Sequence, residues 1–156
     1  MKNIAVIGYG GQGAWHCSQI LASDVCTLTG TYDIRQVRND AAKANGIFVY
    51  DSNEAIFADT TVDIVVIAVP NDSHEYLVIN ALQAGKHVIC EKPVEMSVAS
   101  VDRMIAASKK AGQFLAVLWS VRATISRPLT LAIPATLAGV DSLSPQGDKA
   151  ECMCKS

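Results

Sequence analysis

Short apolar runs alternate along this chain with longer stretches in which apolar residues recur every three or four positions. Residues 4–7 form the first apolar run, and residues 11–22 behind it show the helical spacing. The strongest run, residues 63–69, is rich in β-branched residues, as expected of a strand buried on both faces of a parallel sheet. Such alternation is typical of βαβ units and predicts an α/β fold with a doubly wound parallel sheet, the Rossmann fold.

The same pattern sets the bounds that we expect for each element. Gly46 and Gly85 follow helical stretches, where glycine commonly ends a helix, and Pro70 ends the strongest strand. Six strands are predicted, at residues 4–7, 27–32, 47–50, 63–69, 86–90 and 113–118. Four helices are predicted, at residues 11–22, 35–44, 73–85 and 97–111.

Composition narrows the class of protein without naming a function. The 156 residues suit one domain, and 50% hydrophobic with 18% charged residues is typical of a globular chain. A net charge of -2 argues against the basic surface that nucleic acids require. No apolar run is long enough for a signal peptide or a membrane span, so we expect a cytoplasmic protein that does not bind membranes. Five cysteines without a CxxC pair indicate neither a disulfide framework nor a metal site.

A glycine-rich turn of the form GxGxxG lies where the first strand meets the first helix, and its residues are Gly8, Tyr9, Gly10, Gly11, Gln12 and Gly13. Gly8 allows a tight turn, Gly10 lets the backbone approach a pyrophosphate, and Gly13 lets the helix pack closely on the strand. The free N–H groups of the turn, at the positive end of the helix dipole, are expected to bind the phosphates. Asp33, which stands 20 residues beyond Gly13, is placed to accept hydrogen bonds from the adenosine ribose.

The residues around Asp33 bear on the choice between NAD and NADP. A carboxylate at this position repels the 2′-phosphate of NADP and accepts hydrogen bonds from both ribose hydroxyls of NAD. Arg35 and Arg38 have the charge to bind a phosphate, although the start of a helix is also an ordinary place for solvated arginines. We therefore predict NAD as the cofactor, with Arg35 as a candidate contact, and the choice of NADP stays open.

Two further segments follow predicted strands, and they read Ala68-Val69-Pro70-Asn71-Asp72-Ser73-His74 and Ala84-Gly85-Lys86-His87-Val88-Ile89-Cys90-Glu91-Lys92-Pro93. In this order, and together with the glycine-rich turn, they resemble the Gfo/Idh/MocA oxidoreductases, the family of glucose–fructose oxidoreductase and inositol dehydrogenase. The resemblance runs from Lys2 to about Val117. It implies that both segments border the nicotinamide, with cofactor contacts from Val69, Pro70, Asn71, His74, Glu91, Lys92 and Pro93.

The resemblance also implies an activity, which is hydride transfer between a sugar or cyclitol and a nicotinamide. In this activity Lys92 contacts the substrate hydroxyl, where an ammonium stabilises a developing alkoxide. Its place after a central parallel strand favours this catalytic role over that of an ordinary surface lysine. His74 has two interpretations, a cofactor contact or a residue that only packs and hydrogen-bonds at a helix start. Pro93 permits a cis peptide bond.

The chain departs from the family pattern after Val117. The family's enzymes have a second domain that carries the substrate pocket and the acid/base residues, and residues 119–156 show no such pattern. We expect residues 1–118 to form a dinucleotide-binding domain and residues 119–156 a poorly ordered tail, so that the chain is inactive alone. The alternative is a non-catalytic dinucleotide-binding or redox-sensing module that acts through a partner. A homo-oligomer also stays open.

A frameshift or a truncated gene would explain the change of pattern after Val117, and the coding DNA tests this hypothesis. When the DNA after that codon is read in the other frames, one of them should encode a continuation that resembles the family. If neither frame does, the hypothesis is wrong.

Overall fold

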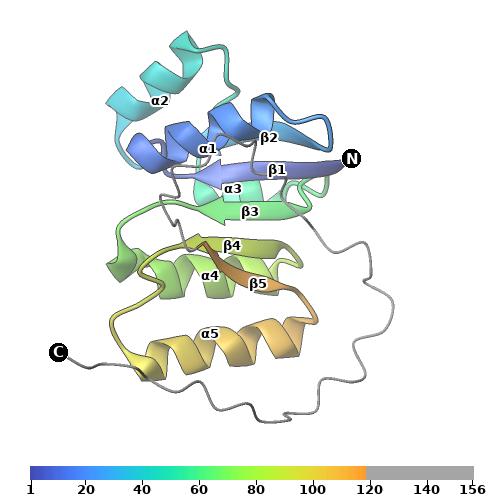
Figure 1. Ribbon diagram of the computed structural model, residues 1–156, viewed down its shortest axis with the longest axis vertical. Coiled ribbons are helices and arrows are strands. Elements are labelled where there is room, and N and C mark those ends of the chain that lie inside the picture. Colours follow the sequence, from blue (N-terminus) through green and yellow to red (C-terminus); the bar gives the residue numbers. More distant parts are fainter. Residues whose placement is uncertain (119–156) are drawn as a thin grey trace, which may run out of the picture. The chain divides into compact units, whose positions relative to one another are not determined.

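Five parallel strands and the helices that connect them make up residues 1–118, the part of the chain that the computed structural model describes (Figure 1). The strands are β1 (Lys2–Ile7), β2 (Cys26–Tyr32), β3 (Ile64–Ile67), β4 (His87–Glu91) and β5 (Leu115–Leu118). The helices are α1 (Gly11–Leu21), α2 (Gln36–Ala44), α3 (Asn53–Ala58), the 3₁₀-helix η1 (Asn71–Ser73), α4 (His74–Gln83) and α5 (Val98–Ala111). The strand order is β2-β1-β3-β4-β5, which confirms the predicted doubly wound sheet.

One predicted strand is wrong, and the α-helix α3 was missed. Residues 47–50 do not form a strand, because they make a single bridge between Val49 and Thr31. Helix α3 begins three residues after Tyr50, and Ser52 caps it by accepting a hydrogen bond of 3.1 Å from the Ala55 N–H. The apolar and β-branched residues of this segment thus belong to a short connection that runs along the edge of the sheet and leads into a helix.

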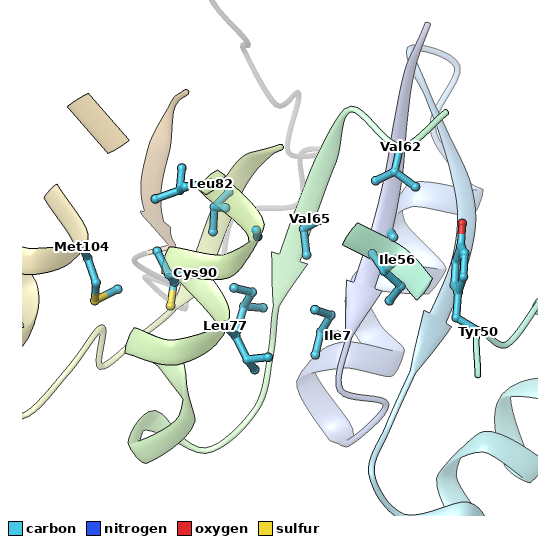
Figure 2. Close-up of a cluster of buried hydrophobic side chains, with 14 residues drawn as sticks. Ile7, Tyr50, Ile56, Val62, Val65, Leu77, Leu82, Cys90 and Met104 are labelled. Carbon is cyan, nitrogen blue, oxygen red and sulfur yellow. The ribbon is translucent and has the colours of Figure 1, made fainter. Parts of the chain in front are cut away.

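Helices cover both faces of the sheet. Successive side chains of a strand point to opposite faces, so a strand made of apolar residues gives the sheet two apolar faces that need to be covered. Ile4 and Val6 of β1 pack with Cys17 and Ile20 of α1 and with Ala42 of α2. On the other face, a larger cluster joins the sheet to α3, α4 and α5 (Figure 2), and its members include Ala5, Ile7, Ile56, Val65, Leu77, Leu82, Cys90 and Met104. None of the helices within residues 1–118 is long and apolar enough to cross a membrane.

The register of the strands brings four segments together at the carboxyl edge of the sheet. Ile7 pairs with Tyr32 on one side and with Ile67 on the other, and Ile67 pairs with Cys90. The residues that come next in each strand therefore form one row along this edge, and they are Gly8, Asp33, Ala68 and Glu91. Every segment that the sequence predicts to bind a cofactor starts in this row.

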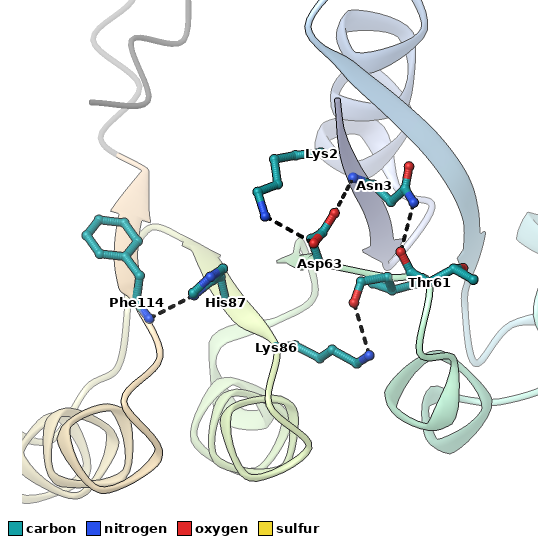
Figure 3. A network of polar contacts seen from close by, with 8 residues as sticks. Lys2, Asn3, Thr61, Asp63, Lys86, His87 and Phe114 are labelled. Atoms are coloured by element: carbon teal, nitrogen blue, oxygen red, sulfur yellow. Dashed lines mark hydrogen bonds and ion pairs between the residues drawn. The ribbon is translucent and has the colours of Figure 1, made fainter. Parts of the chain in front are cut away.

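The amino edge of the sheet is held by a network of polar contacts that includes a buried lysine (Figure 3). Lys86 is 6% exposed, and its ammonium donates to the carbonyl oxygens of Asp59 at 2.5 Å and Val62 at 3.0 Å. Beside it, the carboxylate of Asp63 accepts a hydrogen bond of 2.8 Å from the Asn3 N–H. Lys86 thus satisfies two carbonyl groups of the connection between α3 and β3.

Replacement of Lys86 by methionine keeps the apolar stem but leaves these two carbonyl groups without their donor. We expect the free energy of unfolding to fall by about 1–3 kcal/mol, measured by urea denaturation. Lys109→Met, at an exposed position on α5, is the matched control and should change it by about 0.5 kcal/mol or less. Equal stabilities of the two variants would contradict the assigned role of Lys86.

Candidate functional site

The strand order reverses at the centre of the sheet, between β1 and β3. From β1 the chain moves outward to β2, and from β3 it moves outward in the opposite direction to β4 and β5. The connections that leave the carboxyl ends of β1 and β3 therefore lead away in opposite directions along the sheet. In open α/β sheets, ligands bind at such a switch point, outside the carboxyl ends of the strands.

The glycine-rich turn brings three backbone segments into close contact. Gly8 has a φ of +94°, and a Cβ at this position would collide with the carbonyl oxygen of Ala68. A Cβ at Gly13 would collide with the carbonyl oxygen of Gly8, so only glycine lets α1 approach the turn this closely. These contacts agree with the roles expected of Gly8 and Gly13.

The N-terminus of α1 is open at Gly10 and Gly11. Apart from the adjoining residues and the backbone of α1 itself, no atom of residues 1–118 lies within 4 Å of a Cβ built on Gly10 or on Gly11. The N-cap residue, Gly10, supplies no side-chain hydrogen bond, and the first turn of α1 contains no acidic residue. The first N–H groups of the helix are therefore free to bind an anion, at the positive end of the helix dipole. Gln12 is exposed beside them.

Asp33 joins the turn after β1 to the turn after β2. It is 7% exposed, and its Oδ2 accepts a hydrogen bond of 2.8 Å from the Tyr9 N–H. Its Oδ1 accepts a hydrogen bond of 2.9 Å from the Arg35 N–H, and the Arg35 Nε lies 3.6 Å from the same oxygen. Each carboxylate oxygen can accept a second hydrogen bond, so Asp33 retains acceptor capacity for a ligand. Asn39, which sequence reasoning missed, exchanges hydrogen bonds with the Asp33 backbone at 2.8 and 2.9 Å.

The segment after β3 continues the edge toward β4. Val69, Pro70 and Asn71 lead into α4, and all three are at least partly exposed. His74 is 1% exposed, and its Nε2 and Nδ1 lie 2.9 Å and 3.0 Å from the carbonyl oxygens of Val69 and Val94. Because both ring nitrogens face protein acceptors, this geometry favours the interpretation that His74 packs and hydrogen-bonds. It connects the segment after β3 to the segment after β4.

Glu91 lies at the end of β4 and is 6% exposed. Its Oε1 is 2.6 Å from the Nε2 of His16 on α1, and its Oε2 accepts a hydrogen bond of 3.1 Å from the Lys92 N–H. Lys92 and Pro93 are exposed, and the peptide bond between them is cis. Sequence reasoning missed His16, although its place three residues after Gly13, on the same face of a helix as the glycine expected to pack on the strand, is a signal that it faces inward.

Two buried cysteines lie beside this region, and their chemistry is that of packing residues. Burial raises the pKa of the Cys17 thiol to about 11. Burial, with the nearby charges of Glu91 and Glu95, raises the pKa of the Cys90 thiol to about 12. Both thiols therefore stay protonated at neutral pH and are poor nucleophiles.

Comparison with known proteins identifies the family to which this chain belongs. Residues 2–118 match the family model described as "Oxidoreductase family, NAD-binding Rossmann fold" of the Gfo/Idh/MocA proteins. The chain is 35% identical over 114 residues to a myo-inositol 2-dehydrogenase of Thermotoga maritima, a match that covers 72% of this chain and 34% of the relative. It is also 35% identical over 112 residues to the 2,7-anhydro-N-acetylneuraminate hydratase of Escherichia coli, a match that covers 72% of this chain and 30% of that enzyme.

Solved structures give the same result. An NAD-binding protein of Listeria innocua has 40% sequence identity and a TM-score of 0.72, and the match covers 74% of this chain and 34% of that protein. The chain thus spans about a third of the length of the proteins that it matches. The family match begins and ends within one residue or so of the resemblance that the motifs predicted. The chain belongs to the Gfo/Idh/MocA oxidoreductase family, and the region that shows this membership is the family's NAD-binding Rossmann fold.

Proposed function

We propose that the carboxyl edge of this sheet binds NAD as the cofactor of a sugar or cyclitol oxidoreductase. The observation that carries the proposal is the open N-terminus of α1, where no other part of residues 1–118 comes within 4 Å of the Cβ position of Gly10 or Gly11. A side chain on either glycine would fill the space that a pyrophosphate needs. Free N–H groups and the helix dipole supply the attraction for it.

The adenosine half of the cofactor would lie at Asp33. The carboxylate has acceptor capacity beyond its hydrogen bonds to Tyr9 and Arg35, so it can accept from the ribose hydroxyls. Its charge opposes a 2′-phosphate, and the guanidinium of Arg35 lies close enough to that carboxylate to be attracted to it. We therefore propose NAD as the preferred cofactor and NADP as the weaker ligand.

The nicotinamide half would lie over the ends of β3 and β4. A dinucleotide with its adenosine at Asp33 and its pyrophosphate at α1 extends from β2 across β1, so its other end reaches the segments after β3 and β4. Val69, Pro70 and Asn71 would border it on one side, and Glu91, Lys92 and Pro93 on the other, at the positions where those segments leave the sheet.

Lys92 is the residue that we propose to act on the substrate. A bound nicotinamide supplies the acceptor or donor of hydride. The exposed ammonium of Lys92, beside the substrate hydroxyl, stabilises the negative charge that develops on its oxygen as the hydroxyl proton leaves to a base. The names of relatives, such as myo-inositol 2-dehydrogenase, support a polyhydroxylated substrate.

The described residues do not offer a partner base for Lys92 among their nearby buried groups. Glu91 and His16 hydrogen-bond to each other, and both ring nitrogens of His74 face backbone carbonyls. The relatives are about three times as long as the matched region. We therefore propose that residues 1–118 are a domain that binds the cofactor, and that turnover needs a base and a substrate pocket from outside these residues.

Titration calorimetry with NADH and NADPH tests the cofactor site. Asp33→Ala should weaken NADH binding about 10- to 100-fold, because it removes charge-assisted hydrogen bonds to the ribose. It should also lower the ratio of the affinity for NADH to the affinity for NADPH. Asp63→Ala is the matched control, since its carboxylate also accepts a backbone hydrogen bond but lies at the amino edge. It should leave the affinity for NADH unchanged.

Three results would contradict the proposal. The wild-type chain would bind neither nucleotide, Asp33→Ala would bind NADH as tightly as the wild type does, or the two aspartate variants would lose affinity equally. The melting temperature of each variant, measured beside the titrations, shows whether it is folded.

A further inference from the structure

The contact between His16 and Glu91 links two elements that are not neighbours in the sheet. His16 lies on α1, which follows β1, whereas Glu91 ends β4, and β3 lies between these two strands. The two residues stand 75 positions apart in the sequence, yet Nε2 and Oε1 are separated by 2.6 Å. Both side chains are about nine-tenths buried or more. The pair therefore spans the carboxyl edge from the pyrophosphate side to the Lys92 side.

Glu91 has both of its carboxylate oxygens engaged. Oε1 accepts from the ring of His16, and Oε2 accepts from the N–H of Lys92 at 3.1 Å. The orientation of this carboxylate therefore sets its contact with the backbone N–H of Lys92. His16 is the side chain that fixes that orientation, since a buried carboxylate that loses a partner turns toward another donor or toward water.

The other end of the segment after β4, at Val94, is held by a separate contact with His74. The carbonyl of Val94 lies 3.0 Å from the Nδ1 of His74, and the Nε2 of that ring lies 2.9 Å from the Val69 carbonyl. His74 begins α4, on the sheet face opposite α1. Residues 91–94 are thus fixed from both faces, by His16 through Glu91 and by His74 through Val94.

We propose that His16 is a positioning residue for the nicotinamide half of the cofactor and that it acts through Glu91. The proposal rests on the proposed function, in which the nicotinamide lies against Glu91, Lys92 and Pro93. His16 touches neither the cofactor nor the substrate in this role. It holds the segment after β4 in the conformation that the ring and Lys92 require.

This role predicts a loss that is confined to one half of the cofactor. The sites proposed for the adenosine and the pyrophosphate, at Asp33 and at the start of α1, do not depend on Glu91. ADP-ribose carries both of these groups but lacks the nicotinamide, so its affinity reports on them alone. A residue with a merely structural role would alter the two affinities together or leave both unchanged.

The experiment compares the affinities of NADH and ADP-ribose for the full chain and its variants. His16→Ala should weaken NADH binding about tenfold and change the affinity for ADP-ribose less than about twofold. His16→Gln should restore most of the loss, because its amide can donate to Glu91. The double variant His16→Ala/Glu91→Ala should bind NADH no more weakly than Glu91→Ala, since both changes break one contact.

His87→Ala is the matched control, because His87 is a half-buried histidine of β4 that accepts a hydrogen bond from the Phe114 N–H at the opposite edge. It should leave both affinities unchanged. If His16→Ala does not fold, His16→Asn replaces it, since the shorter amide cannot reach Glu91.

Parallel losses for NADH and ADP-ribose, no loss of NADH affinity, or failure of glutamine to restore it would overturn the role of His16. In these cases the wild-type chain still binds both ligands, and the proposed function stands. A wild-type chain that binds neither ligand would overturn the proposed function, and this role with it.

Discussion

The close approach of α1 to the turn after β1 is the constraint on which the candidate site depends. Gly13 lies against the carbonyl of Gly8, and Gly8 lies against the carbonyl of Ala68 after β3, with no space for a Cβ at either glycine. This packing directs the N-terminus of α1 toward the carboxyl edge of the sheet. It also brings His16, one turn further along α1, within reach of Glu91. These two contacts thus set the position of the proposed phosphate site and of His16, which supports the segment of Lys92.

Most of the fold follows from local patterns in the sequence. The β-branched run around Ile64–Ile67 suits a buried strand, and Gly85, in the left-handed region, follows α4 as expected after a helical stretch. The segment of residues 47–50 has the residue types of a strand, but its pairing partners are decided by the tertiary structure. There it makes one bridge to Thr31 before α3 begins.

The candidate site also has some features that the sequence reveals and others that only the structure reveals. The glycine spacing and the distance to Asp33 are visible in the sequence because a turn, a helix and the next strand have nearly fixed lengths. The hydrogen bonds of Asp33 to Tyr9 and Arg35, and the pair of His16 and Glu91, join segments whose proximity only the sheet register creates. His74 is similar, because its motif suggests a ligand contact whereas its ring nitrogens face two backbone carbonyls.

An NMR titration of the isotopically labelled full chain with NAD⁺ tests most directly the claim that the carboxyl edge of the sheet is the cofactor site. The amide signals of Gly10 and Gly11 and of Glu91 and Lys92 should shift together with one saturation curve, while those of the amino edge, such as His87, stay in place. Shifts that are confined to the amino edge, or the absence of any shift at high NAD⁺ concentration, would contradict the account.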